Sequence, residues 1–158
     1  MKIEKKIFIL FIFFLLISCG FKPINSNKNI NLLIGQLNLT GDKDAAERIK
    51  IKLQKYKTTL KNPQLKIFNI EIFSKRIKSV KTKDTKGNPD VYKLDLTVEF
   101  KAHINNQLLI EKTYSEDTTY NAESSESKMA FVEKKLISDL SRIITNRIIF
   151  SLQEILNE

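Results

Sequence analysis

Few side chains in this chain of 158 residues are suited to chemistry, and they lie far apart. The only cysteine, Cys19, could act as a nucleophile, as a redox group or as the attachment point of a covalent modification. The only histidine, His103, could carry a proton or bind a metal, but no second histidine or carboxylate accompanies it at ligand spacing. We therefore expect no catalytic residue, no metal site and no enzymatic activity.

A basic tract in the middle of the chain could bind anions. Ammonium and guanidinium groups pair with phosphate oxygens, arginine through two parallel hydrogen bonds and lysine as a point charge. Within the tract these charges are opposed only by Asp84. The alternative is a solvated loop in a protein that is rich in lysine throughout. The candidate anion-binding residues are Lys75, Arg76, Lys78, Lys81, Lys83 and Lys86.

The residues before Cys19 predict export from the cytoplasm. Residues 1–6 contain three lysines and one glutamate, and residues 7–17 are eleven apolar residues without a break. This length suits a removable signal peptide, because a stable bilayer span needs ~20 apolar residues. The next residues, Leu16-Ile17-Ser18-Cys19, resemble the lipobox of bacterial lipoproteins.

The lipobox resemblance implies a chemical fate for Cys19. Its thiol would take a diacylglycerol, the chain would be cut just before it, and the new amine would be acylated. Several acyl chains, at ~0.8 kcal/mol per buried methylene, make such an anchor effectively permanent. Gly20 stands where inner-membrane lipoproteins often carry aspartate, which favours the outer membrane. No cofactor is expected besides this covalent lipid.

The mature chain would hold 140 residues with 24 basic and 17 acidic side chains, a net charge of +7. A positive surplus favours phosphate-rich partners, although part of it could be compositional. Export excludes cytoplasmic nucleic acid as a partner, so lipopolysaccharide is the obvious polyanion. Once acylated, Cys19 has no thiol for a disulfide, and the domain must be stabilised by its core.

Apolar patterns predict four strands. The clearest alternates apolar and polar residues from Tyr92 to Ile104, and paired asparagines join it to the next strand in a tight hairpin. The second strand has apolar residues at both parities, as expected for an inner strand or one with a bulge. A turn over residues 86–89 precedes the third strand. The predicted strands cover residues 30–39, 64–80, 92–104 and 107–120.

Two helices complete the pattern. Asp42 can cap a helix whose apolar positions continue to Leu60, where Asn62-Pro63 would stop it. Ser124 or Ser125 can cap a longer C-terminal helix. The fold class is therefore α+β: a four-stranded, mostly antiparallel sheet with two helices packed on one face, in the order β-α-β-β-β-α. The long helix has its apolar stripe at Ile137, Leu140, Ile144, Ile148, Leu152 and Ile155, widened by Leu136 and Ile143.

The mature chain resembles the lipopolysaccharide-assembly lipoprotein family LptE. The resemblance depends on "CGFKP" at residues 19–23, "YN" at residues 120–121 and "EKKLISDLSRIITNRIIFSL" at residues 133–152, together with the order of elements. It divides the chain into a lipoprotein signal peptide (1–18), a lipidated N-terminus and tether (19–29) and a single LptE-like α+β domain (30–158).

The resemblance implies an outer-membrane lipoprotein that acts as plug and assembly partner of the β-barrel LptD. Such a protein contacts lipopolysaccharide on its way to the outer leaflet and catalyses no reaction. The alternative is an envelope lipoprotein that binds another protein or an anionic glycan and has no role in lipopolysaccharide export. Tyr114 and Tyr120 could contact the barrel or could pack locally within the domain.

Overall fold

The computed structural model describes residues 32–60 and 64–157. They belong to a compact unit that runs from Asn31 to the C-terminus. The predicted signal peptide, Cys19 and the tether lie outside the described residues. Within the described part, no helix has both the length and the apolar character needed to cross a membrane.

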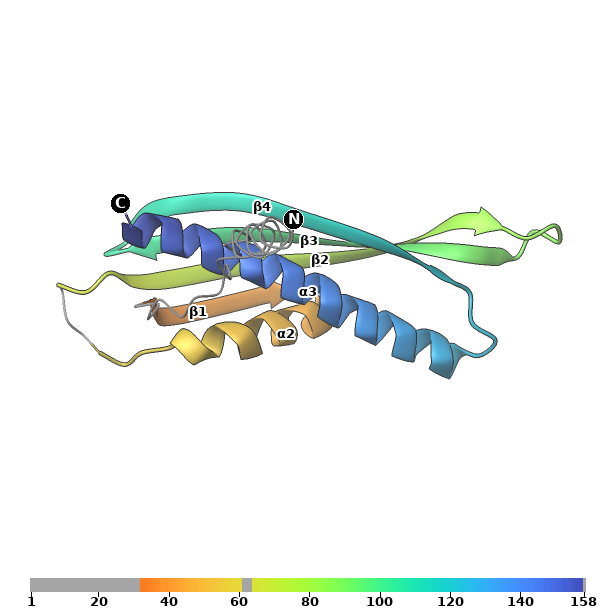
Figure 1. Ribbon diagram of the computed structural model, residues 1–158, viewed down its shortest axis with the longest axis horizontal. Coiled ribbons are helices and arrows are strands. Elements are labelled where there is room, and N and C mark those ends of the chain that lie inside the picture. Colours follow the sequence, from red (N-terminus) through yellow and green to blue (C-terminus); the bar gives the residue numbers. More distant parts are fainter. Residues whose placement is uncertain (1–31, 61–63, 158) are drawn as a thin grey trace, which may run out of the picture. The chain divides into compact units, whose positions relative to one another are not determined.

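The elements follow one another in the predicted order, strand, helix, three strands, helix (Figure 1). Both helices lie on one face of a four-stranded sheet, so the predicted α+β class is confirmed. A short 3₁₀ turn extends the first helix. The elements are β1 (Leu33–Gly41), α2 (Lys43–Leu53), η2 (Gln54–Tyr56), β2 (Ile67–Lys83), β3 (Pro89–Ile104), β4 (Gln107–Asn121) and α3 (Glu126–Asn157).

The strands lie in the sheet in their sequence order, β1-β2-β3-β4. β1 is parallel to β2, whereas the other two pairs are antiparallel. The parallel pair requires a crossover, which α2 provides. The β3–β4 hairpin turns at Asn105 and Asn106, both with positive φ (50° and 65°), as the paired asparagines predicted.

Alternation along the strands decides which face forms the core. The even-numbered side chains of β3 from Leu94 to Ala102 are buried beneath the helices, while the odd-numbered ones face solvent. β2 follows the same parity with Phe68, Ile70 and Ile72, and it is an inner strand as predicted. The core therefore lies on one side of the sheet only.

The long helix α3 confirms its predicted stripe. Five of the six named apolar positions are buried, and Ile155 is partly buried. Ser125 is the residue that caps the helix: its hydroxyl accepts a hydrogen bond from the backbone N–H of Lys128, with 3.4 Å between the heavy atoms. The buried stripe explains why a helix of 32 residues is stable here.

The predicted end of the first helix is wrong. α2 ends at Leu53, and after η2 the chain is extended at Lys57, where it forms an isolated parallel bridge with Ile34. The backbone N–H of Thr58 donates to the carbonyl oxygen of Ile34 at 2.8 Å, so this segment is tied to the edge of β1. Leu60, expected to continue the apolar stripe, is exposed.

Candidate functional site

The candidate site is the part of the β2–β3 hairpin that continues past the end of β1. Gly41, the last residue of β1, pairs with Ser74 of β2. Beyond Ser74, β2 continues for nine residues, and no strand of the described residues pairs with its edge on the β1 side. We call residues 75–88, which comprise this stretch and the following turn, the arm. The hairpin formed by the arm and the start of β3 projects at one end of the sheet (Figure 1). All six predicted anion-binding residues lie on it, within a strand and a tight turn and not within a loop.

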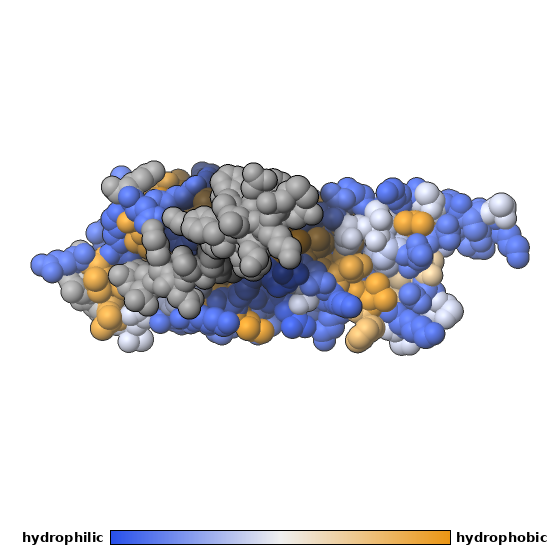
Figure 2. All heavy atoms as spheres, in the orientation of Figure 1, coloured by the Kyte–Doolittle hydropathy of each residue, from blue (hydrophilic) through white to orange (hydrophobic). Residues whose placement is uncertain are grey.

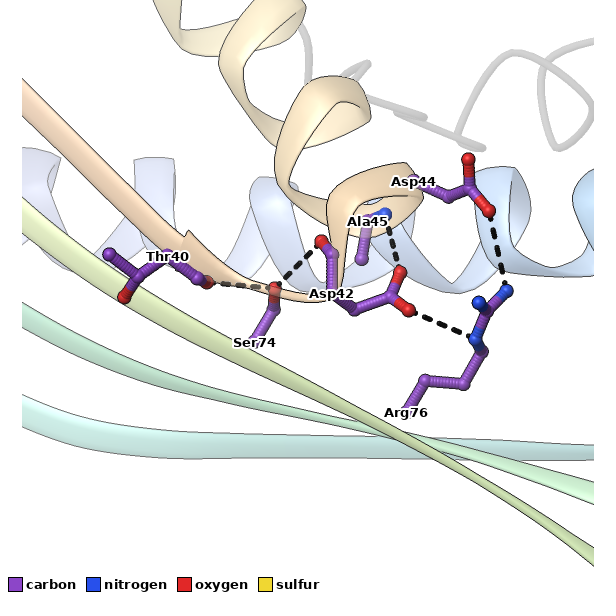
Figure 3. A network of polar contacts seen from close by, with 6 residues as sticks. All are labelled: Thr40, Asp42, Asp44, Ala45, Ser74 and Arg76. Carbon is purple, nitrogen blue, oxygen red and sulfur yellow. Dashed lines mark hydrogen bonds and ion pairs between the residues drawn. The ribbon is translucent and has the colours of Figure 1, made fainter.

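A close approach of two backbones ends β1 and starts α2. The backbone N–H of Asp42 donates to the carbonyl oxygen of Ser74 at 2.8 Å. The buried Ser74 hydroxyl lies 3.2 Å from the carbonyl oxygens of Thr40 and Asp42 (Figure 3). Gly41 has a φ of +95°, and a Cβ there would lie 1.9 Å from the Ser74 oxygen. Only glycine allows this contact.

Arg76, the second residue of the arm, is a cation that already has protein partners. The Nε of Arg76 lies 3.0 Å from a carboxylate oxygen of Asp42, and its terminal nitrogen lies 3.4 Å from Asp44 (Figure 3). The other oxygen of Asp42 caps α2 by accepting from the N–H of Ala45 at 2.9 Å. Arg76 therefore fastens the first turn of α2 to β2, and an external anion would have to compete with two carboxylates.

Lys78 likewise has an ion-pair partner in the protein, on α3. Its Nζ lies 2.5 Å from Glu133 and 4.2 Å from the ring centroid of Tyr92, which stacks on Tyr120 at 5.6 Å between centroids. Burial alone would raise the pKa of Glu133, but hydrogen bonds from Lys78 and Tyr120 outweigh it and lower that pKa. Burial and the bond to Glu133 raise the pKa of the Tyr120 hydroxyl.

The other four basic residues of the arm are exposed, and no ion pair holds them within the described part of the chain. Three of them surround the turn, whose acidic residue, Asp84, is used locally. Its Oδ1 accepts from the N–H groups of Lys86 and Asn88, each at 2.8 Å. The Asn88 bond is the main reason that the pKa of Asp84 is lowered. The four available cations are Lys75, Lys81, Lys83 and Lys86.

Asp84 is not the only acidic residue near the positive charges of the arm, as the sequence had suggested. Asp90, the second residue of β3, lies across the hairpin, between the pairs that join Thr82 to Val91 and Lys83 to Pro89. Around the turn, three available lysines face these two aspartates, which leaves a surplus of one positive charge. Figure 2 shows the projecting end of the hairpin as mainly hydrophilic. The geometry suits weak, salt-sensitive binding of an anionic surface, because exposed charges are strongly screened.

Sequence reasoning located the arm but missed the partners of its inner cations. Asp44 lies 32 positions from Arg76, and Glu133 lies 55 positions from Lys78. The sequence held one indication of these contacts. Both cations have even residue numbers, like the buried residues of β2, and alternate residues of a strand lie on the same face. They lie on the side of the sheet that carries the helices.

The remaining candidates lie away from the arm. His103 is on the open face of the sheet, between Asn69 of β2 and Leu108 of β4. Tyr114 packs locally: its hydroxyl lies 2.7 Å from the Ser151 hydroxyl of α3, and its ring is tilted against Phe100. Tyr120 is buried in the contact with Glu133.

Solved structures of bacterial lipoproteins share this fold. The rare lipoprotein B from Shewanella oneidensis has a TM-score of 0.58 and 14% identity, covering 78% of this chain and 100% of its own. An uncharacterized lipoprotein B from Nitrosomonas europaea has a TM-score of 0.58 and 10% identity, with coverages of 81% and 88%. A minor lipoprotein from Acinetobacter baumannii has a TM-score of 0.54 and 15% identity, with coverages of 76% and 94%. The sequence matches no protein-family model and no curated protein.

Proposed function

We propose that this protein is an outer-membrane lipoprotein that acts as plug and assembly partner of an LptD-type β-barrel. In this role it assists the transport of lipopolysaccharide and its insertion into the outer leaflet. It is anchored on the periplasmic side through lipid on Cys19. Its work is binding, occlusion and guidance, with no chemical step.

The observation that carries the proposal is the fold. The described domain covers the whole of the Shewanella rare lipoprotein B structure, and the other two structures are also lipoproteins. The lipobox-like residues before Cys19 and the LptE-like "CGFKP" point independently to the same class of protein. Because fold alone does not give function, the barrel and lipopolysaccharide require direct tests.

The arm supports a role in contacting lipopolysaccharide. Lys75, Lys81, Lys83 and Lys86 are exposed on the arm, with their ammonium groups unpaired within the described residues. Lipid A phosphates are anions that such groups recognise. Arg76 and Lys78 are less accessible to a ligand, because their ion pairs with α2 and α3 would have to be replaced.

Isolation of the lipidated protein from native membranes in mild detergent tests the barrel partnership. We expect a large outer-membrane β-barrel to copurify in a fixed ratio, and depletion of the protein to reduce lipopolysaccharide at the cell surface. Recovery as a lone monomer, with unchanged surface lipopolysaccharide, would contradict the proposal. That result would favour the envelope lipoprotein that binds another protein or a glycan.

A set of charge variants tests the arm. Replacing Lys75, Lys81, Lys83 and Lys86 together by glutamine should weaken binding to lipopolysaccharide-containing vesicles, most clearly at low salt, where exposed charges act over the longest range. The matched control replaces four exposed lysines on the helices and η2, so that the net charge changes equally: Lys50, Lys55, Lys134 and Lys135. Equal loss of binding in both variants would show that only net charge matters.

A further inference from the structure

One end of the described domain carries all of its exposed leucines. β1 and β2 start at this end, since they pair in parallel from their first residues. The β3–β4 turn lies there too, because Asn69 near the start of β2 pairs with His103 near the end of β3. The Nζ of Lys66 donates to the carbonyl oxygen of Ile155 at 3.0 Å, which places the last turn of α3 at the same end. The exposed leucines are Leu60, Leu65, Leu108 and Leu109.

These leucines come from two connections that cross this end. Leu60 follows the segment that is tied to Ile34 near the start of β1, and Leu65 stands two residues before β2. Leu108 and Leu109 follow the β3–β4 turn, where a shift in register leaves Leu109 without a partner on β3. Single exposed apolar residues are ordinary, but exposed leucines gathered in one region mark a surface that contacts an apolar partner.

Unpaired lysines accompany the leucines. Lys55, Lys57 and Lys66 lie on η2 and on the connection from η2 to β2, and no ion pair holds them within residues 32–60 and 64–157. Two acidic residues of this region, Glu111 and Glu154, each face a lysine of their own, at 2.8 and 3.9 Å. Leucines bordered by cations suit an anionic lipid surface, because apolar side chains enter the acyl boundary while ammonium groups stay among the headgroups. We call the four leucines and these three lysines the leucine end.

The length of chain that follows Cys19 restricts which end of the domain can reach a membrane. Cys19 stands 14 positions before Leu33, the first residue of β1, and a chain of that length spans at most about 50 Å when fully extended. The turn of the arm lies at the opposite end of β2, whose 17 residues rise about 55 Å. If the domain stood on the arm, the start of β1 would lie further from the lipid than this length of chain can span. A lipid on Cys19 therefore favours contact through the leucine end.

We propose that the lipidated protein, before it joins a barrel, rests on the periplasmic lipid surface by its leucine end. The leucines enter the acyl boundary, and the three lysines lie among anionic headgroups. This inference rests on the lipid anchor of the proposed function and does not depend on the barrel. A second copy of the chain fits this surface less well, because two leucine ends would bring their unpaired lysines together. The arm, at the other end of the sheet, then points away from the membrane (Figure 1).

Site-specific fluorescence on the full-length lipidated protein tests this orientation. Cys19 is the only cysteine and is acylated in the proposed mature protein, so one introduced cysteine can be labelled alone. Leu108→Cys places an environment-sensitive probe at the leucine end, and Ile77→Cys places it on the arm at a matched exposure, 45% against 46%. In vesicles of neutral and anionic phospholipid, we expect brominated lipids to quench the probe of Leu108→Cys and aqueous iodide to quench that of Ile77→Cys.

A matched pair of double variants tests the contribution of the leucines. In the labelled Leu108→Cys protein, Leu60→Asp with Leu65→Asp should lower lipid quenching roughly tenfold, because charged side chains replace apolar ones that enter the lipid. Ile51→Asp with Phe131→Asp removes two exposed apolar side chains from the helices and should leave the quenching unchanged. Circular dichroism checks that both variants are folded. Equal loss of quenching in the two would overturn the proposed contact.

The remaining outcomes separate this inference from the proposed function. Lipid quenching at both probe positions would mean that the domain lies flat on the membrane, and lipid quenching at neither would mean that it does not touch the lipid. Shielding of the Leu108→Cys probe from iodide without lipid quenching, increasing with the ratio of protein to lipid, would assign the leucine end to a second copy. Each of these results overturns the inference and leaves the proposed function standing. A mature protein without acyl groups on Cys19, detected by mass spectrometry, would overturn both.

Discussion

Two halves of β2 differ sharply although they belong to one continuous strand. In the half that pairs with β1, the helix-facing side chains are apolar and buried, as at Ile72, which is 2% exposed. In the arm, the same side of the strand carries Arg76 and Lys78, and Ile77 on the other side is 46% exposed. The first half can contribute to stability through burial, whereas the arm has little apolar surface to bury.

The end of β1 is one boundary between the two halves of β2. The ion pairs of Arg76 and Lys78 extend contact with the rest of the domain a few residues further. Arg76 and Lys78 lie in the arm by sequence, yet their partners belong to α2 and α3. These two cations therefore link the arm to the helices, whereas the other four basic residues of the arm have no ion-pair partner among the described residues. Substitutions along β2 can therefore separate stability from binding.

The largest effect is expected at the junction, for Gly41→Val. A side chain there would collide with the Ser74 carbonyl and would also strain a positive φ, so we expect a loss of about 4 kcal/mol in the free energy of unfolding. Urea unfolding of the lipidated protein in detergent, followed by circular dichroism, measures it. Gly87→Val at the tip of the arm is the control: φ is +85° but no atom lies within 4 Å of the added Cβ, so strain alone should cost about 1–2 kcal/mol.

The next effect compares one residue type in the two halves of β2. Ile72→Ala should lower the free energy of unfolding by about 3 kcal/mol, because it leaves a cavity in the core. Ile77→Ala removes the same atoms from an exposed position and should cost less than about 1 kcal/mol. Similar losses in the same denaturation assay would mean that the arm is packed against something in the protein.

A smaller effect is expected at the contact between the arm and α3. The pKa of Glu133 is lowered in the folded state, so its contribution to stability is complete above the ordinary glutamate pKa and is lost as the pH falls through the folded value. Glu133→Gln should cost about 1 kcal/mol at pH 7 and reduce the pH dependence of stability in acid. Thermal melts from pH 3 to pH 7 measure both; Glu154→Gln, an exposed position on the same helix, should change neither.

The smallest effect is expected for the four unpaired lysines of the arm, Lys75, Lys81, Lys83 and Lys86. Their joint replacement by glutamine should change the free energy of unfolding by no more than about 0.5 kcal/mol, because exposed positions without partners contribute little. The same variant should lose binding to lipopolysaccharide vesicles. A clear loss of stability in urea would show that these lysines support the fold.

Much of the fold could be predicted because its signals are local. Alternation from Leu94 to Ala102 and the Asn105-Asn106 turn identified the β3–β4 hairpin, and the apolar stripe identified α3. The end of α2 could not be predicted, since Lys57 leaves the helix to bridge to Ile34, a contact between distant residues. The helical spacing of Leu60 predicted a longer helix, but pairing of Lys57 with Ile34 ends the helix earlier.

The site was predicted only in part, for the same reason. A run of basic residues is visible in sequence, but which of them are free depends on carboxylates from α2 and α3. Asp90 illustrates the point: it follows the tract in sequence, and strand pairing brings it beside Lys83. Once the strand is known to continue through the tract, its alternation places Arg76 and Lys78 on the helix side and Lys75 on the open side.

The parallel pairing of β1 with β2 has a consequence for the order in which the strands pair during folding. Thr40 of β1 bonds to Ile72 across 32 positions, whereas β3 and β4 are joined by a two-residue turn. Loop-closure entropy favours the short-range hairpins first. β1 and α2, although they lead the described part of the chain, should therefore dock last, after β2, β3 and β4 have formed the rest of the sheet.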